Sequence, residues 1–300
     1  MIARNFVKEA AASGQSIRGI HLTFAAPSVI EVLAAADLQF VYVDGEHGCF
    51  DWRDIEAACV AAERHNLTPI ARLPDLSSAS ITRFLDRGVR GLVLPHVESV
   101  DDARKAIDAA YFAPVGNRSF GAGRPEYGQW TGGRPAYMHA CNAALSLCMM
   151  IESQRGLDVA HQVAALPGVD YLSFGMLDLA QSLGHPGNSS HPDVKAAVAK
   201  CIDGIHRAGK RVREDFMNYV WINDVLIAGA RQLLDAAPLA ARKGVAHARA
   251  PPLRAPIGPV RQRRRGGKLD RSTLGRRRPA LAAVFAASAG AAFSREIAYE

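Results

Sequence analysis

Residues 145–175 read LSLCMMIESQRGLDVAHQVAALPGVDYLSFG, and this stretch decides the fold. Two short apolar runs, at 145–153 and 169–175, flank residues 155–166, whose apolar side chains recur at the spacing of a helix face. A strand, a helix and a second strand in this order predict a βαβ unit with parallel strands.

The same alternation continues on both sides of this unit and predicts an α/β protein, a (β/α)8 TIM barrel. Helices are expected to begin near Asp51, Ser78 and Ser99 and to stop near Gly88, Gly209 and Gly229. Seven helices are recognisable and the eighth is not. The predicted strands are residues 17–24, 40–47, 68–74, 91–97, 145–153, 169–175, 210–214 and 231–236, and the predicted helices are residues 28–37, 51–66, 78–88, 99–112, 155–166, 191–209 and 219–229.

The chain changes character after residue 238. Residues 239–300 hold 14 Lys and Arg against 3 Asp and Glu, a net charge of +11, whereas the whole chain carries +7 and residues 1–238 therefore carry −4. We predict one barrel domain over 1–238 and an atypical, disordered basic tail over 239–300, rich in Ala, Arg and Pro. Its arginine runs could bind polyanions non-specifically, but a solvated tail or one produced by a reading-frame change is the favoured interpretation.

Cysteine usage and apolar runs indicate a cytoplasmic protein. The five cysteines form no CxxC pair, and their odd number argues against a disulfide framework. The N-terminus lacks the apolar core of a signal peptide, and the late stretch LAAVFAASAGAAF is too short to span a bilayer. We expect no membrane partner and no specific nucleic-acid partner.

Polar side chains stand where the predicted strands end, which is the edge of a (β/α)8 barrel that carries the active site. They come from the second, third, fifth and sixth strands. The residues are Asp44, Glu46, His47, Arg72, Glu152, Gly175 and Asp178.

Glu152 and Asp178 are the residues that we expect to hold a divalent cation. Carboxylates at the ends of adjacent strands can converge on one hard cation, with water and substrate oxygens completing its coordination. Either carboxylate alone could equally be a helix cap or a salt-bridge partner. A cation would polarise the carbonyl of a 2-keto acid and make the adjacent C–H acidic, which is enolate chemistry.

Arg72 and His47 are the predicted catalytic side chains. The guanidinium of Arg72 stays charged and can stabilise a developing oxyanion, while His47 titrates near neutrality and can relay a proton. Asp44 could orient His47, and Glu46 is expected to point outward or to hydrogen-bond water.

The remaining histidines are given structural roles. His21 and His96 could line the barrel mouth, but a satisfied polar residue near the core is the favoured interpretation of each. His185 and His191 belong to the turn GHPGNSSHPD at 184–193, where turn chemistry explains them.

Two other classes of mechanism lack support. Schiff-base aldolases need a lysine at a strand end, and among the lysines of residues 1–238 only Lys210 lies beside a strand, at its wrong end. No GxSxG, Walker or strand-linked GxGxxG motif is present, which disfavours hydrolases, kinases and dehydrogenases.

Over about residues 15–237 the sequence resembles the HpcH/HpaI family of metal-dependent 2-keto-3-deoxy-sugar-acid and 4-hydroxy-2-oxoheptanedioate aldolases, related to citrate lyase β-subunits. The motifs that carry the resemblance are specific only together. They are VDGEHG (43–48), ARLP (71–74), PVGNRSFG (114–121), MIES (150–153) and FGMLDLAQSLGHPGN (174–188).

The resemblance implies a barrel of the phosphoenolpyruvate/pyruvate-binding type and a class II aldehyde-lyase. Such an enzyme cleaves a 4-hydroxy-2-oxo acid to pyruvate and an aldehyde through a metal-stabilised pyruvate enolate, with Mg2+, Mn2+ or Co2+ as cofactor. By motif position Glu152 and Asp178 would ligate the metal, His47 with Asp44 would manage the proton, and Arg72 would hold the keto oxygen.

The resemblance also implies how the substrate is held and how the chain assembles. Backbone amides around Gly175, Leu177 and Asp178 would receive the pyruvate carboxylate. Arg118 or Arg124, in the loop that meets the aldehyde, could grip a distal carboxylate, although a loop salt bridge is an equal expectation. Family members end in an eighth helix that packs against a partner subunit in dimers, and these dimers assemble into hexamers, so a homo-oligomer is expected if the C-terminus permits it.

Two departures and two alternatives accompany this prediction. Met150 stands where the family commonly has Gln, and Met176 stands where it commonly has Pro. The same enolate site could serve a citrate-synthase-like or other acyl-condensing transferase. The chain could also be an inactive, truncated or frame-altered scaffold.

Overall fold

The computed structural model describes residues 4–121 and 132–236. Its centre is a sheet of eight parallel strands in the order β7-β6-β5-β4-β3-β2-β1-β8, with at least one helix between each consecutive pair from β1 to β7. The strands are β1 (Ile17–Leu22), β2 (Phe40–Asp44), β3 (Thr68–Arg72), β4 (Gly91–Leu94), β5 (Ser146–Ile151), β6 (Tyr171–Phe174), β7 (Arg211–Val212) and β8 (Met217–Trp221).

Local sequence signals set most helix ends. Asp51 and Ser99 cap the helices that follow them, and Ser77 caps the helix that begins at the expected Ser78. Gly88 and Gly209 have positive φ after helix ends, as expected. The helices are α1 (Phe6–Ser13), α2 (Pro27–Leu33), α3 (Trp52–Arg64), α4 (Ser78–Asp86), α5 (Val100–Ala110), α6 (Gly133–Ala144), α7 (Gln154–Ala164), α8 (Met176–Ser182), α9 (Pro192–Arg207) and α10 (Ile222–Ala236), with 3-10 turns at Ala34–Ala36 and Arg213–Asp215.

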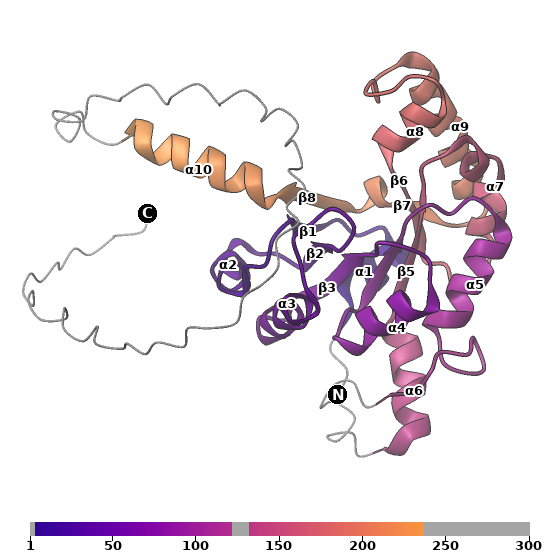
Figure 1. Cartoon of the computed structure of the whole chain (residues 1–300), viewed down its shortest axis with the longest axis horizontal. Coiled ribbons are helices and arrows are strands. Elements are labelled where there is room, and N and C mark those ends of the chain that lie inside the picture. Colours follow the sequence, from indigo (N-terminus) through magenta and orange to yellow (C-terminus); the bar gives the residue numbers. More distant parts are fainter. Residues whose placement is uncertain (1–3, 122–131, 237–300) are drawn as a thin grey trace, which may run out of the picture. The chain divides into compact units, whose positions relative to one another are not determined.

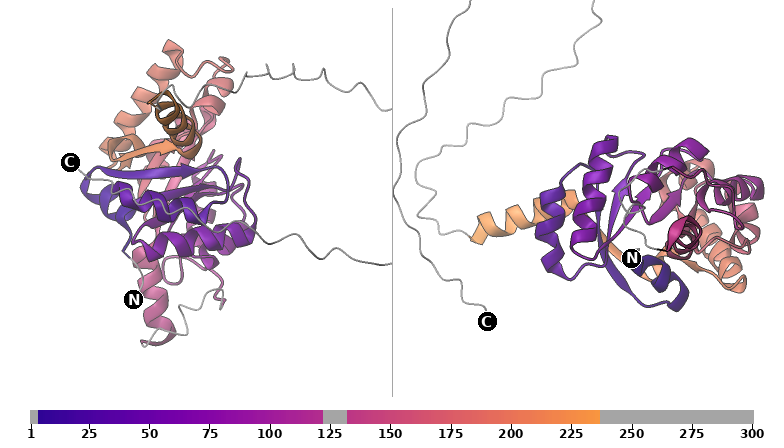
Figure 2. Two further views of the ribbon diagram at one scale, coloured as in Figure 1. Left: turned by 90° about the vertical axis from the view of Figure 1, so that its left-hand side faces the viewer. Right: turned by 90° about the horizontal axis from the view of Figure 1, so that it is seen from below.

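The sheet curls into a half-barrel. β1 pairs with β2 on one side and with β8 on the other, so that Ile17 aligns with Met217. The five residue steps from Val212 to Met217 span at most about 18 Å, which holds the edge strands β7 and β8 near each other. Helices cover the outer side of the curl (Figures 1 and 2). The predicted α/β architecture of the TIM-barrel type is confirmed.

The C-terminal third of the barrel differs from the prediction. The strand expected at 231–236 is the end of α10, and the last strand is Met217–Trp221, inside and just before the helix expected at 219–229. Gly229 lies within α10 and does not end it. The missing helix is therefore the one between β7 and β8, where only residues 213–216 connect the two strands, whereas the helix after β8 is present.

Two apolar cores lie on opposite faces of the strands. Alternate residues such as Val41 and Leu92 pack with the outer helices, and their neighbours such as Phe40 and Tyr171 pack inside the curl. α1 contributes Val7 to the inner core. The near-continuous apolar runs of the strands follow from this burial on both faces.

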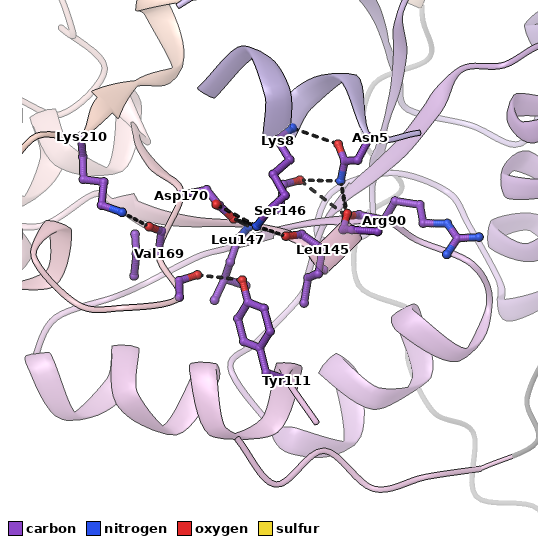
Figure 3. Close-up of polar contacts among 12 residues, drawn as sticks. Asn5, Lys8, Arg90, Tyr111, Leu145, Ser146, Leu147, Val169, Asp170 and Lys210 are labelled. Atoms are coloured by element: carbon purple, nitrogen blue, oxygen red, sulfur yellow. Dashed lines mark hydrogen bonds and ion pairs between the residues drawn. The ribbon is translucent and has the colours of Figure 1, made fainter. Parts of the chain in front are cut away.

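α1 is fixed to the N-terminal ends of the strands, opposite the expected active site (Figure 3). The Asn5 amide donates to the carbonyls of Arg90 (2.8 Å) and Ala144 (2.7 Å), and its oxygen caps α1 by accepting from the backbone N–H of Lys8 (3.0 Å). Lys8 Nζ donates to the Leu145 carbonyl (2.6 Å). These bonds satisfy buried carbonyls that precede β4 and β5.

Some expectations fall on residues outside the described ranges. The basic tail predicted over 239–300 and Arg124 are among them, so both stay predictions. Within residues 4–121 and 132–236, no helix combines the length and the apolar character that crossing a bilayer requires.

Candidate active site

The predicted site residues come mostly from the carboxyl ends of the strands, as the fold requires. Asp44 ends β2, Arg72 ends β3, Glu152 follows β5 and Gly175 follows β6. The structure joins Asp44, Glu46 and Arg72 in one set of contacts, and His96 links Glu46 to Glu152.

Asp44 is a buried carboxylate that neighbouring strands neutralise. Arg72 binds it with two donors, Nε to Oδ1 at 3.0 Å and Nη2 to Oδ2 at 2.7 Å, and His21 Nε2 lies 3.3 Å from Oδ2. Burial opposes ionisation, but the hydrogen bonds from His21 and Arg72 and the Arg72 charge outweigh it and hold the pKa of Asp44 well below its usual range. The site therefore favours the ionised form of Asp44.

Glu46 does not point outward as expected. Its side chain is 11% exposed; Oε2 lies 3.2 Å from Arg72 Nε, and Oε1 lies 3.2 Å from His96 Nε2. Arg72 thus lies between two carboxylates, Asp44 and Glu46, which fix its guanidinium in one orientation.

His47 lies beside these groups with its side chain 66% exposed. Asp44 Oδ1 accepts from the backbone N–H of His47 at 3.2 Å, so Asp44 positions the backbone of His47. The ring has its Nε2 4.0 Å from Glu46 Oε2. An exposed imidazole at the strand ends can exchange a proton with a substrate or with solvent.

Glu152 is buried at the end of β5 against Gly175. A Cβ atom on Gly175 would meet Glu152 Oε2 at 2.2 Å, so the glycine makes room for the carboxylate. Glu152 Oε1 accepts from the backbone N–H of His96 (2.5 Å) and lies 3.0 Å from His96 Nδ1. Burial raises the pKa of Glu152, and the charges of Glu46 and Asp178 add to this, while His96 opposes it.

Asp178 and Leu177 lie in the first turn of α8, directly after β6, and both are exposed. The charges of Asp178 and Glu46 both contribute to the raised pKa of Glu152, so the three carboxylates act on one another through their charges.

His96 has a role in the site that differs from the satisfied position near the core expected from the sequence. His96 is 59% exposed in its side chain and bridges Glu46 and Glu152. Its φ of 53° is unusual for a residue with a side chain. The sequence feature that could have predicted this role is the position of His96 two residues after β4, at the same end of the barrel as the other polar groups.

His21 lies between aromatic rings at the end of β1. Its ring stacks on Trp221 (3.9 Å between centroids) and on Tyr42 (4.5 Å), and Nε2 contacts Asp44. We expected His21 to be a buried polar residue with all its hydrogen bonds made. Nε2 has a partner, but Nδ1 is buried without a hydrogen-bond partner. Burial lowers the pKa of His21, although Asp44 opposes this, so the ring is a neutral support for Asp44.

Arg118 is not brought together with the other predicted site residues of this chain. Its Nη2 pairs with Asp86 at the end of α4 (2.9 Å), and it lines a groove of about 1030 Å³ between α4 and α5. The contact with Asp86 is the loop salt bridge that was the equal expectation.

The two methionines that depart from the family pattern pack with other apolar side chains. Met150 is buried inside the curl, and Met176 packs against the outer core. Neither side chain adds a polar group to the site.

Comparisons with known proteins agree with this geometry. The sequence model of the HpcH/HpaI aldolase/citrate lyase family matches residues 18–245. A hydroxypyruvate/pyruvate aldolase from Roseovarius nubinhibens is 33% identical over 69% of this chain and 80% of its own length. A 2-keto-3-deoxy-L-rhamnonate aldolase from Salmonella gallinarum is 31% identical over 69% of this chain and 77% of its own length.

Two solved structures share the fold. An HpcH/HpaI aldolase/citrate lyase family protein from Burkholderia cenocepacia superposes with a TM-score of 0.70 at 30% identity, covering 77% of this chain and 98% of the other. A citrate synthase superposes with a TM-score of 0.66 at 25% identity, covering 79% of this chain and 98% of the other.

Proposed function

Since this chain belongs to the HpcH/HpaI aldolase/citrate lyase family, we propose that it is a metal-dependent aldolase that cleaves a 4-hydroxy-2-oxo acid to pyruvate and an aldehyde. The observation that carries the proposal is the linked set of charged side chains at the strand ends, in which Arg72 pairs with Asp44 and Glu46, and His96 joins Glu46 to Glu152. The relatives named hydroxypyruvate/pyruvate aldolase support the same substrate class.

The residues present fit a hard divalent cation. Glu152 is a carboxylate whose pKa is raised by burial and, to a smaller extent, by the charges of Glu46 and Asp178. A cation such as Mg2+, Mn2+ or Co2+ would relieve this repulsion, with Glu152 and Asp178 as its protein ligands. When bound, it would act as a Lewis acid toward the carbonyl oxygen of the 2-oxo acid.

The chain's own residues would manage the charge and the proton. His47 would accept the proton of the 4-hydroxyl as the bond between carbons 3 and 4 breaks, which releases the aldehyde and leaves the enolate of pyruvate. Arg72 would stabilise the negative charge on the enolate oxygen. The proton on His47 would then return to carbon 3 and complete pyruvate.

The 2-oxo acid's carboxylate would lie at the start of α8. The absence of a side chain at Gly175 leaves room for the Glu152 carboxylate beside the start of α8. In this arrangement Asp178 and the amides around Gly175 and Leu177 face one substrate end.

Two of the described lysines contact the sheet, and neither of them favours a Schiff-base mechanism. Lys8 lies on α1 and Lys210 contacts the carbonyl of Val169 before β6, both at the opposite end of the strands from Asp44 and Glu152. A Schiff base needs an amine at the site.

The test of the function is pyruvate release from a panel of 4-hydroxy-2-oxo acids, coupled to lactate dehydrogenase. We expect EDTA to remove the activity and Mg2+ or Mn2+ to restore it, because cation binding offsets the repulsion among the carboxylates. A cooperative melt followed by circular dichroism serves as the control that the chain is folded. Full activity in EDTA would contradict the metal mechanism.

The structural likeness to a citrate synthase keeps one alternative open, a transferase that condenses an enolate with another electrophile. Release of pyruvate in the absence of any acyl-coenzyme A distinguishes the aldolase from the transferase. All five cysteines lie in the described residues and none of them forms a disulfide bond, which fits the cytoplasmic location that we propose.

We further propose that the protein forms a homo-oligomer through α10. Four large apolar side chains of α10 are at least 48% exposed and recur at helical spacing, so they form one exposed apolar stripe. Figure 1 shows α10 extending away from the sheet. The stripe consists of Leu226, Ile227, Leu233 and Leu234.

Charged substitutions on this stripe should dissociate the assembly. We expect Ile227→Lys with Leu233→Lys to reduce the particle mass measured by light scattering to that of one chain. Val32→Lys, at another exposed apolar position, is the matched control and should leave the mass unchanged. A wild-type protein of single-chain mass would refute the proposal.

A further inference from the structure

A second cluster of metal-ligating side chains lies outside the active site, in the segment that joins α8 to α9. It consists of His185, His191 and Asp193, whose ligand atoms all lie within 4.8 Å of one another. The expected site residues Glu152 and Asp178 are not part of it. The turn chemistry predicted from the sequence explains the backbone of this segment, but it does not explain why both imidazoles lie against one carboxylate.

The backbone of the segment is fixed by short-range bonds. Gly184 and Gly187 have φ of 82° and 74°, and these left-handed residues fold the chain back on itself. The His185 N–H donates to the Ala180 carbonyl (2.7 Å), and the His191 N–H donates to the Asn188 carbonyl (3.1 Å). The two histidines are therefore held together before any ligand arrives.

The side-chain distances are close to those of a metal site. The rings of His185 and His191 stack with centroids 3.5 Å apart and planes at 15°. Asp193 Oδ2 lies 3.5 Å from His185 Nε2 and 3.7 Å from His191 Nδ1. Ligand atoms at tetrahedral angles around Zn2+ are about 3.4 Å apart, given bonds of about 2.0–2.1 Å.

We propose that His185, His191 and Asp193 form a binding site for a borderline transition-metal ion such as Zn2+. Two imidazoles and one carboxylate favour such ions over Mg2+ or Ca2+, which prefer oxygen ligands. Asp193 is 75% exposed, so solvent can reach the cluster and supply a fourth ligand. The ion would join the end of α8 to the start of α9.

Metal binding requires two local changes. The stacked rings must turn about their last side-chain torsion to aim their lone pairs at one point, and this torsion is broad in histidine. His191 Nδ1 also accepts from the backbone N–H of Asp193 at 3.2 Å as the N-cap of α9, and ligation through Nδ1 replaces this bond. The variants that test the site must therefore separate capping from ligation.

The test is Zn2+ binding to the full chain, measured by calorimetry. The background carries Glu152→Gln and Asp178→Asn, so that the proposed catalytic cation site does not contribute. We expect one Zn2+ per chain, with affinity at least tenfold lower in His185→Gln, which leaves the cap intact. His191→Ser keeps a capping oxygen but removes the imidazole, and it should lose affinity to the same extent.

Two controls make the outcome decisive. His206→Gln removes an exposed histidine that pairs with a single carboxylate, Asp215 (2.8 Å), and should leave Zn2+ affinity unchanged. Mg2+ in large excess should not displace Zn2+. The proposal is overturned if His185→Gln and His191→Ser bind Zn2+ like the background protein, or if His191→Ala loses affinity while His191→Ser retains it, because the histidine would then act as a cap alone.

Discussion

Replacing Arg72 by alanine should lower kcat/KM for pyruvate release by about 100- to 1000-fold, the usual effect of removing one preorganised donor to a developing oxyanion. Asp44 and Glu46 hold the Arg72 guanidinium in place before substrate binds. The charge therefore need not reorganise as the enolate forms, and its loss should fall mainly on kcat.

The alanine variant has a structural side effect that a second variant controls. Removing Arg72 leaves the buried carboxylate of Asp44 with His21 as its remaining side-chain partner, which destabilises the fold. Arg72→Ala combined with Asp44→Asn should recover the melting temperature, because the buried carboxylate that Arg72 neutralises is then absent. Recovery of activity in the double variant would show that Arg72 acts only on folding.

Glu152→Gln should abolish metal-dependent turnover, with a loss of about 1000-fold or more, because a Lewis acid contributes several kcal/mol to the transition state. The same substitution should raise the melting temperature in EDTA at neutral pH. The buried, ionised Glu152 destabilises the fold, and glutamine keeps the shape that fits against Gly175 without the charge.

The difference in melting temperature between Glu152→Gln and the wild type should depend on pH. At pH values below the ordinary carboxyl pKa of 4.5 Glu152 is neutral in both the folded and the unfolded chain, so the variant gains nothing. As the pH rises through the raised pKa of the folded state, ionisation costs the wild type stability and the gap in melting temperature opens. Asp178→Asn is the matched variant. Because Asp178 is exposed, we expect this substitution to abolish turnover but to change the stability of the fold little. A lower melting temperature of Glu152→Gln at neutral pH would contradict the argument.

The sequence was sufficient for the barrel up to β6 because each strand there is a short apolar run bounded by a capped helix, as at Asp51 and Ser99. It was insufficient after residue 210. The run at 231–236 has apolar residues that suit a strand or a helix, and only pairing with β1 shows that Met217–Trp221 is the strand. Tyr219 and Trp221 carried the usable signal, since aromatic residues favour strands.

For the site, Asp44, Arg72 and Glu152 could be predicted because each lies at the end of a predicted strand. The contacts that their side chains make could not be predicted in this way. Glu46 and His96 bond to each other across two strands that are not neighbours in the sheet, β2 and β4. Such a pairing depends on the curl of the sheet, which no local pattern encodes. For Arg118 the position in a motif was misleading. The motif suggested that Arg118 binds substrate, whereas in the folded chain its guanidinium pairs with Asp86.

The pairing of β1 with β8 sets the order in which the chain can assemble on the ribosome. Ile17 and Met217 are partners, whereas each other ladder joins strands far nearer in sequence. Contacts that close long loops form late, because the chain loses conformational entropy when the loop closes and the stabilising contacts form only afterwards. The first strand thus keeps an open edge until the last one has been synthesised, and an open edge is a template for pairing with another chain. In the growing polypeptide, the part most exposed to aggregation is therefore the one made first.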